Sequence, residues 1–293
     1  MNFIQSHNAD GTIVNLYYED WGSGNPVVLI HGWPLDHQMW EHQMRVLPEM
    51  GLRCIAYDRR GFGKSDKPWS GYDYDTFADD LKAVLDQLDL QNVTLVGFSM
   101  GGGEVVRYFS RHGGNRVSKV VLLSSIAPFT LQTEDNPDGV PMETLEEMID
   151  NLQEDRPAFL SGFGKMFYGV NIISHQVSQA TLDWNLSLAM QASPKATIEC
   201  VHAFGETDFR AEMRTINVPA LVIHGGADKI VPIEATGERA SQLIKDAKYV
   251  VYDDAPHGLF ITEKEQLTAD LLEFIEAKSD SFVEENPDFE QNI

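Results

Sequence analysis

A serine between two glycines, in the run Gly97-Phe98-Ser99-Met100-Gly101, is the feature of this sequence that most clearly indicates chemistry. The apolar, β-branched segment 92–96 precedes it and a helical pattern follows it, so the local order is strand, sharp turn, helix. In such a turn the serine backbone is strained and its hydroxyl stands clear of the sheet, while the glycines avoid collisions with neighbouring elements. A glycine-rich turn with an incidental serine is the plain alternative. The strand-turn-helix context favours a nucleophile at Ser99.

A serine that attacks a carbonyl group creates an oxyanion, which needs hydrogen-bond donors. The backbone N–H of Met100 stands in the first turn of the predicted helix, where amides lack intrahelical partners and the helix dipole is positive. A second donor is expected from the loop after an earlier buried strand. The strand pattern 26–30, which runs into the turn His31-Gly32-Trp33-Pro34, has this form. We therefore predict the backbone N–H groups of Trp33 and Met100 as the oxyanion hole.

The serine also needs a base to take its proton, and the base needs a carboxylate to orient it. In enzymes with this type of turn the chain order is nucleophile, acid, histidine. After Ser99, the strand pattern 218–224 runs into a loop that carries Asp228, and the strand pattern 248–252 runs into a loop that carries His257. We therefore predict Asp228 as the acid and His257 as the base.

Other histidines offer competing assignments. His31 lies in the predicted oxyanion turn, where hydrogen bonding that holds the loop is the favoured role, and His224 lies near Asp228 and could orient that loop. His37 and His42 are interpreted as ordinary residues of an amphipathic helix over 37–50. No pair at i, i+4 has a carboxylate partner, so we predict no metal site.

Two further patterns resemble nucleotide-binding loops without meeting their requirements. The run 61–65 ends like a phosphate-binding loop, but Asp58 stands where that motif needs a glycine. The run 101–103 lacks the spacing and the downstream acid of a dinucleotide fingerprint. We therefore predict no cofactor.

Charge is the unusual part of the composition. The chain has 45 acidic and 22 basic residues in 293, a formal net charge of -23. Such a chain is a poor partner for nucleic acid, because binding to phosphates needs clustered lysine and arginine. Residues 279–293 are acidic and poor in apolar side chains, and we interpret them as a mobile tail. Cys54 falls in a buried-strand pattern and Cys200 in a helical pattern, and both are interpreted as small core residues and not as a disulfide.

The sequence contains no apolar run of 18 residues, and its first residues lack the charged and apolar regions of a signal peptide. We therefore expect a cytoplasmic protein that is not bound to a membrane. A homo-oligomer is compatible with the sequence, which leaves the oligomeric state open.

Alternation of strand and helix patterns predicts an α/β fold. A hairpin over 3–20 is followed by strands near 26–31, 53–57, 92–98, 117–124, 218–224 and 248–252, with helices over 74–88, 100–113, 233–245 and 263–277 between or after them. This order indicates an approximately eight-stranded, mostly parallel sheet with helices on both faces and the site at the carboxyl ends of the strands. We expect a core of 1–126 and 216–278, interrupted by a helical cap over 127–215.

The cap carries aromatic and apolar side chains that can form a substrate pocket. Phe129, Phe163 and Trp184 of the cap, with Ile230 beside the predicted acid, are our candidates. The alternative is that most cap residues only form the cap's own small core.

Five segments carry a family resemblance: His31-Gly32-Trp33-Pro34-Leu35, the run 58–65, the run 97–104, the run 136–141 and Pro256-His257-Gly258. In this order they resemble the α/β-hydrolase family of bacterial aryl esterases, also called cofactor-free (non-haem) haloperoxidases or perhydrolases. The likeness runs from about residue 5 to 277. The acidic segment beyond it departs from the family pattern.

The resemblance implies the same assignments: Ser99 as nucleophile, Asp228 as acid, His257 as base, and Trp33 and Met100 as oxyanion donors. It implies a serine esterase that cleaves small aryl or alkyl esters through an acyl-enzyme without a metal or organic cofactor. If hydrogen peroxide replaces water, the product is a peracid, which can oxidise halide outside the protein. Hydrolysis of a γ-lactam or amide is the alternative reaction. A non-catalytic ligand-binding protein of the same fold is the alternative of another class.

Overall fold

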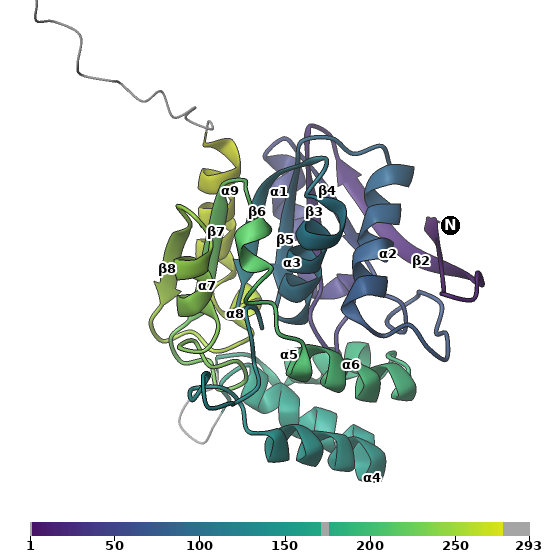
Figure 1. The fold of residues 1–293 in the computed structure, drawn as a ribbon, viewed down its shortest axis with the longest axis vertical. Coiled ribbons are helices and arrows are strands. Elements are labelled where there is room, and N and C mark those ends of the chain that lie inside the picture. Colours follow the sequence, from purple (N-terminus) through teal and green to yellow (C-terminus); the bar gives the residue numbers. More distant parts are fainter. Residues whose placement is uncertain (1, 171–175, 278–293) are drawn as a thin grey trace, which may run out of the picture.

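The central sheet sets the frame for every loop discussed below. The computed structural model describes residues 2–170 and 176–277. Within them, eight strands form one sheet in the order β1-β2-β4-β3-β5-β6-β7-β8 (Figure 1). The strands are β1 (Phe3–His7), β2 (Ile13–Gly22), β3 (Asn25–Ile30), β4 (Leu52–Tyr57), β5 (Val93–Phe98), β6 (Val117–Leu123), β7 (Ala220–Gly225) and β8 (Lys248–Tyr252).

Only the first two strands depart from parallel pairing. β1 pairs antiparallel with β2, and β2 pairs antiparallel with β4, whereas the pairs from β4 through β8 are parallel. β5 and β7 are buried along their whole length, which explains their uninterrupted apolar sequences. The predicted sheet is therefore confirmed in its strand number and in its mostly parallel character.

Helices cover both faces of the sheet (Figure 1). On one face α1 (Glu41–Glu49) contacts α9 (Lys264–Glu276), and on the other α2 (Tyr74–Gln87) packs beside α3 (Met100–His112). Shorter helices lie between these elements: η1 (His37–Trp40), η2 (Met213–Thr215), α7 (Gly237–Leu243) and α8 (Leu259–Thr262). None of the helices in the described residues combines the length and the apolar character that a membrane span requires.

Three helices lie beyond the carboxyl ends of the parallel strands (Figure 1). They are α4 (Met142–Phe167), α5 (Gln179–Ala189) and α6 (Pro194–Glu206), and α4 contacts the other two. The helical pattern around Cys200 indicated part of α6 without its bounds, which Ser193 as the N-cap and Pro194 in the first turn set at its start. The expected acidic tail over 279–293 lies outside the described residues.

α4 extends beyond the helical pattern that the sequence shows over residues 142–152, because it continues through a kink. The backbone of Asp155 leaves the helical region, with φ −148° and ψ 79°, two residues before Pro157. The Asp155 carboxylate accepts the N–H of Ala158 at 3.0 Å and so caps the second half of the helix. Pro157 has no N–H to donate to the preceding helical turn, but it is tolerated in the first turn of a helix. The first half of α4 therefore ends near Asp155, and the second half begins there.

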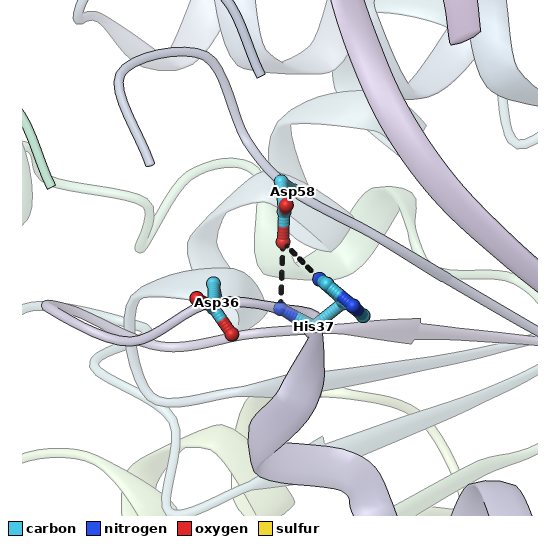
Figure 2. A group of neighbouring side chains, drawn as sticks. All are labelled: Asp36, His37 and Asp58. Carbon is cyan, nitrogen blue, oxygen red and sulfur yellow. Dashed lines mark hydrogen bonds and ion pairs between the residues drawn. The ribbon is translucent and has the colours of Figure 1, made fainter. Parts of the chain in front are cut away.

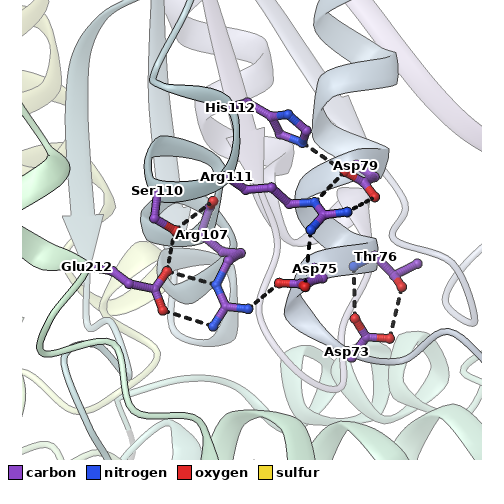
Figure 3. A network of polar contacts seen from close by, with 9 residues as sticks. All are labelled: Asp73, Asp75, Thr76, Asp79, Arg107, Ser110, Arg111, His112 and Glu212. Atoms are coloured by element: carbon purple, nitrogen blue, oxygen red, sulfur yellow. Dashed lines mark hydrogen bonds and ion pairs between the residues drawn. The ribbon is translucent and has the colours of Figure 1, made fainter.

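An ion-pair network fastens α3, the helix that follows the glycine-rich turn, to its neighbours (Figure 3). Asp75 on α2 accepts hydrogen bonds from both Arg107 and Arg111 on α3. Arg111 also pairs with Asp79 at 2.7 Å, and Arg107 pairs with Glu212 at 2.8 Å. Each exposed pair contributes little alone, but the network fixes two arginines of one helix against two other segments.

A second polar cluster joins the end of β4 to the start of η1 (Figure 2). Asp58 Oδ1 accepts both the backbone N–H of His37 at 2.8 Å and its Nδ1–H at 2.6 Å, and Asp58 Oδ2 accepts the N–H of Lys64 at 2.8 Å. Asp36 lies beside them, is fully buried, and caps η1 by accepting the N–H of Gln38. The interpretation of His37 as an ordinary helix residue is therefore wrong: the predicted helix 37–50 is divided into η1 and α1, and His37 is buried against a carboxylate.

Lys119 on β6 stabilises the carboxyl end of α9. Its ammonium group donates to the carbonyl oxygens of Phe274 at 2.8 Å and Ile275 at 2.7 Å, and at 2.5 Å to Ala277. The last carbonyl groups of a helix have no intrahelical donors, so a cation in this position satisfies them.

We expect Lys119→Met to lower the free energy of unfolding by about 2 kcal/mol, because several buried carbonyl groups lose a charged donor. Denaturation in urea measures the loss. The matched control is Lys248→Met, which removes an exposed pair with Glu273 on the same helix and should cost less than about 1 kcal/mol. Equal losses in the two variants would contradict the capping role of Lys119.

Asp36 makes the stability of the fold depend on pH. Burial and the nearby Asp58 carboxylate raise the pKa of Asp36 to about 6, against 3.8 for an ordinary aspartate. Between about pH 4 and 6 the folded protein therefore holds a proton that the unfolded chain has released. This contribution to stability is present at low pH, falls as pH rises through that window, and is absent above it.

Asp36→Asn keeps a side-chain oxygen for the cap but cannot ionise. We expect its free energy of unfolding, relative to wild type, to rise by about 1–3 kcal/mol between pH 4 and pH 7. Urea denaturation at several pH values measures this difference. Asp73→Asn, a change at the exposed N-cap of α2, is the control and should give a difference that varies much less with pH. A pH-independent difference for Asp36→Asn would refute the assignment.

Candidate active site

Ser99 occupies the turn between β5 and α3 in a conformation that side-chain-bearing residues rarely adopt. Its backbone has φ 53° and ψ −119°, and its N–H donates to the carbonyl oxygen of Leu123 on the adjacent strand at 2.9 Å. At Gly97, an added Cβ would lie 2.6 Å from the carbonyl oxygen of Gly101, so a side chain would force the turn open. The glycines on both sides of the serine thus allow the tight strand-to-helix turn that the sequence predicts.

A continuous hydrogen-bonded chain joins Ser99 to two residues far along the sequence. Ser99 Oγ lies 2.9 Å from Nε2 of His257, and Nδ1 of His257 lies 2.7 Å from Oδ2 of Asp228. Asp228 follows β7 and His257 follows β8, so the parallel strands bring all three side chains to the same edge of the sheet. With Nδ1 protonated, Nε2 of His257 is free to accept the serine proton.

Asp228 is held as an anion although it is buried. Its Oδ1 accepts the N–H groups of Ile230 at 2.8 Å and Val231 at 2.9 Å. Burial by itself would raise the pKa of Asp228, but the charge of His257 and hydrogen bonds from His224 and His257 keep it well below the usual value. His224 Nε2 lies 3.3 Å from Asp228 Oδ2 and 3.1 Å from the Val231 carbonyl oxygen, so it fastens this loop.

Two phenylalanine rings fix the plane of the His257 imidazole. Phe98 and Phe167 each lie with their ring centroid 4.9 Å from that of His257, and the Phe167 ring meets it edge to face. His257 is 1% exposed. The sequence placed Phe167 among the cap aromatics that can wall the pocket, but the structure packs its ring on His257 instead. This contact arises where the end of α4 meets the loop after β8, which the sequence pattern does not reveal.

The loop after β3 lies directly against the nucleophile. An added Cβ at Gly32 would lie 2.6 Å from the Phe98 ring and 3.0 Å from Cβ of Ser99. Within the described residues, neither the backbone N–H of Trp33 nor that of Met100 donates a hydrogen bond to a protein acceptor. Both amides are therefore available to an oxyanion on the carbon that Ser99 attacks.

A buried polar network holds this loop. His31 Nδ1–H donates to the carbonyl oxygen of Gly32 at 2.9 Å, and His31 Nε2 accepts the N–H of Arg59 at 2.9 Å. Arg59 donates to the His31 carbonyl oxygen and forms a fully buried ion pair with Glu104 on α3, with both distances at 2.9 Å or below. Tyr57 also donates to Glu104. The loop-holding role favoured for His31 agrees with these contacts.

A cavity of about 180 Å³ opens onto Ser99 and His257. Its remaining walls are mostly apolar and come from the cap, the oxyanion loop and the Asp228 loop. They include Trp33, Ile126, Val140, Leu145, Met148, Phe159, Phe163, Phe204, Ile230 and Val231. Two predicted pocket residues, Phe163 and Ile230, line it.

The other two predicted pocket residues lie elsewhere. Phe129 is buried with its ring under the Arg210 guanidinium, at 4.8 Å, so it faces away from the cavity that its neighbour Thr130 lines. Trp184 stands on the opposite side of the cap, where α5 approaches α1 and α9, and lines a separate hollow with His42 and Lys264. The rotation of α5 about its axis decides where Trp184 points, and the weakly amphipathic sequence of α5 did not reveal that rotation.

Among the described residues, Asp36, His37 and Asp58 form one group that has the donor types of a metal site. Asp58 already accepts three N–H groups and Asp36 caps η1, so the hydrogen bonds of the fold occupy these carboxylates. The group is therefore better explained as a hydrogen-bond network that holds neighbouring loops together than as a metal centre. The absence of a cofactor stays a prediction.

Comparison with known proteins agrees with this geometry. Residues 25–264 match a family model described as the alpha/beta hydrolase fold. The chain is 43% identical to a non-heme chloroperoxidase from Kitasatospora aureofaciens, over 89% of this chain and 96% of that protein. It is 39% identical to a bifunctional esterase/perhydrolase from Acinetobacter calcoaceticus, again over 89% and 96%.

A solved structure shows the same architecture. The crystal structure of a bromoperoxidase from Bacillus anthracis superposes with a TM-score of 0.90 at 44% identity, and the match covers 94% of this chain and 99% of that one. The strand order, the turn at Ser99 and these matches over nearly the whole chain lead to one conclusion: the protein belongs to the α/β-hydrolase family.

Proposed function

We propose that the protein is a serine hydrolase that cleaves small carboxylic esters through an acyl-enzyme, with Ser99, Asp228 and His257 as its catalytic residues. The observation that carries this proposal is the hydrogen-bonded chain from Asp228 through His257 to Ser99, which ends at an apolar cavity. The esterase and perhydrolase names of the relatives support the same reaction class.

The geometry supports a two-step mechanism. Ser99 Oγ attacks the ester carbonyl carbon while His257 Nε2 takes its proton, and the oxyanion accepts hydrogen bonds from the N–H groups of Trp33 and Met100. His257 then gives the proton to the departing alcohol, which leaves the acyl group on Ser99. A water molecule that is deprotonated by His257 attacks this acyl-enzyme and releases the carboxylic acid.

The size of the cavity sets the class of ester. A cavity of about 150 Å³ accepts benzene, and the cavity beside Ser99 measures about 180 Å³. One short alkyl or aryl group therefore fills it, and the rest of the substrate must extend toward the opening. We infer that residues 127–215 act as a cap that limits the substrate to this size.

The same acyl-enzyme explains a peroxide-dependent side reaction. Hydrogen peroxide in place of water takes the acyl group from Ser99 and yields a peracid, and the serine oxygen recovers its proton through His257. The peracid then oxidises halide in solution and returns to the carboxylate. No redox centre in the protein takes part in this route. Residence in the cytoplasm and homo-oligomerisation remain predictions from the sequence.

We expect Ser99→Ala or His257→Ala to lower kcat for p-nitrophenyl butyrate by about 10^4–10^6, because the three catalytic side chains act as a unit. Asp228→Asn should cost less, about 10^4. Thermal unfolding of each variant checks that the fold is retained. More than a few per cent of wild-type activity in a folded Ser99→Ala protein would disprove the assignment of the nucleophile.

We expect bromination to depend on a carboxylic acid and on Ser99. With peroxide and bromide in acetate buffer, the wild type should brominate monochlorodimedone, whereas in phosphate buffer without carboxylic acid the rate should fall to the blank. Ser99→Ala should be inactive in both buffers, since it cannot form the acyl-enzyme. Bromination by Ser99→Ala would reveal an oxidative site of another kind.

A further inference from the structure

Lys229 is an exposed residue that lines the cavity beside Ser99. It follows Asp228 directly, and it lines the cavity together with Ser99 and His257. Among the described lining residues it is the one lysine, and the others are apolar, hydroxylic or the histidine His257. A cation therefore faces a substrate-binding space that is otherwise almost entirely apolar.

In the described part of the chain, this cation has no protein partner. Lys229 is exposed, and within the described residues it forms no ion pair or side-chain hydrogen bond. The adjacent Asp228 does not neutralise it by contact, because its two oxygens are bound to His257, His224 and two backbone N–H groups. Several other lysines of the described residues do have partners, as Lys195 pairs with Glu199 and Lys248 with Glu273.

A second hollow adjoins the cavity at Lys229. This hollow of about 460 Å³ shares Lys229 and Met166 with the catalytic cavity, so these two side chains form the boundary between the two spaces. Lys165 lines this outer hollow, as does Asp254, which lies outside ion-pair distance of Lys229. A substrate that extends from the inner cavity toward the second hollow therefore comes beside Lys229.

The apolar inner cavity and the cationic Lys229 favour different chemical groups at the two ends of a substrate. A charged group in the inner cavity would lose its water without gaining a partner, which is costly, so an apolar group belongs there. A carboxylate at the opening would meet Lys229 while remaining partly hydrated. The overall charge of -23 repels anions, so an anionic ester depends on local attraction to Lys229 in order to bind.

We propose that Lys229 makes the enzyme prefer esters that carry a free carboxylate at the end that points out of the cavity, such as half-esters of dicarboxylic acids. This substrate preference rests on the proposed ester hydrolysis. Lys229 acts on binding and not on the bond-breaking step, because the reacting atoms lie at Ser99.

The test compares two esters that differ in one charge: mono-p-nitrophenyl adipate and its methyl-capped neutral counterpart. The measured quantity is the ratio of kcat/KM for the anionic ester to kcat/KM for the neutral ester. In Lys229→Gln this ratio should fall by about tenfold, mainly through KM, as expected for loss of one partly desolvated charged contact. Lys229→Glu should lower it further, and Lys229→Arg should retain it.

Two controls isolate the local contact from a general charge effect. Lys245→Gln removes an equal charge from an exposed lysine that lines neither hollow, and its ratio should match that of the wild type. In about 1 M NaCl, where the Debye length is about 3 Å, the wild-type ratio should decline toward that of Lys229→Gln. The proposal would be overturned if this kcat/KM ratio changed by less than twofold in Lys229→Gln, or if it changed equally in Lys245→Gln.

A binding measurement separates this proposal from the proposed reaction. In the Ser99→Ala background, which cannot form an acyl-enzyme, calorimetry measures the affinity for monomethyl adipate with Lys229 and with Lys229→Gln. A loss of about tenfold supports the role of Lys229, and equal affinities contradict it. If the wild type cleaves neither ester, the proposed hydrolysis is wrong, and calorimetry still decides whether Lys229 selects anions.

Discussion

The strained backbone of Ser99 is the constraint on which the rest of the site depends. A non-glycine residue with φ 53° and ψ −119° costs about 1–3 kcal/mol, so the surroundings must hold it in place. Three contacts hold this backbone conformation. The N–H of Ser99 donates to the carbonyl oxygen of Leu123 on β6, Gly97 packs closely against Gly101, and α3 begins at the next residue. The same geometry sends its hydroxyl toward His257 and turns the Met100 amide toward the space where an oxyanion forms.

A buried charge pair extends this constraint to the oxyanion loop. Arg59 and Glu104 are fully buried, and such a pair is tolerated only when further hydrogen bonds satisfy both groups. The additional bonds go to the carbonyl oxygen of His31 and come from Tyr57. Glu104 stands on α3, one turn after Ser99, so the pair connects the helix that follows Ser99 to the loop that carries Trp33, the proposed second oxyanion donor. Removing either charge would leave the other buried without its partner.

The cap adds selectivity to a reaction centre that the sheet already positions. Trp33 donates its indole N–H to the carbonyl oxygen of Thr197 on α6, at 3.0 Å, and its ring meets Phe163 on α4 edge to face. The oxyanion loop and the cap are therefore packed as one wall of the cavity. Ile230 and Lys229, which also line the cavity, belong to the loop of Asp228, the proposed catalytic acid. In the proposed function, substrate shape and charge are thus recognised by residues adjacent in sequence to the proposed catalytic residues.

The sequence by itself determined the sheet, its parallel character, and the three loops that carry Ser99, Asp228 and His257, because each is encoded locally by a strand pattern followed by a turn. Parallel strands end at one edge, so their loops must meet. Tertiary structure alone decided which cap side chains face the cavity: Phe163 does, whereas Phe129 and Trp184 do not. It also decided that α4 continues through Asp155, that His37 is buried on Asp58, and that Phe167 packs on His257. Such contacts depend on how helices rotate and pack against distant segments, which local periodicity does not specify.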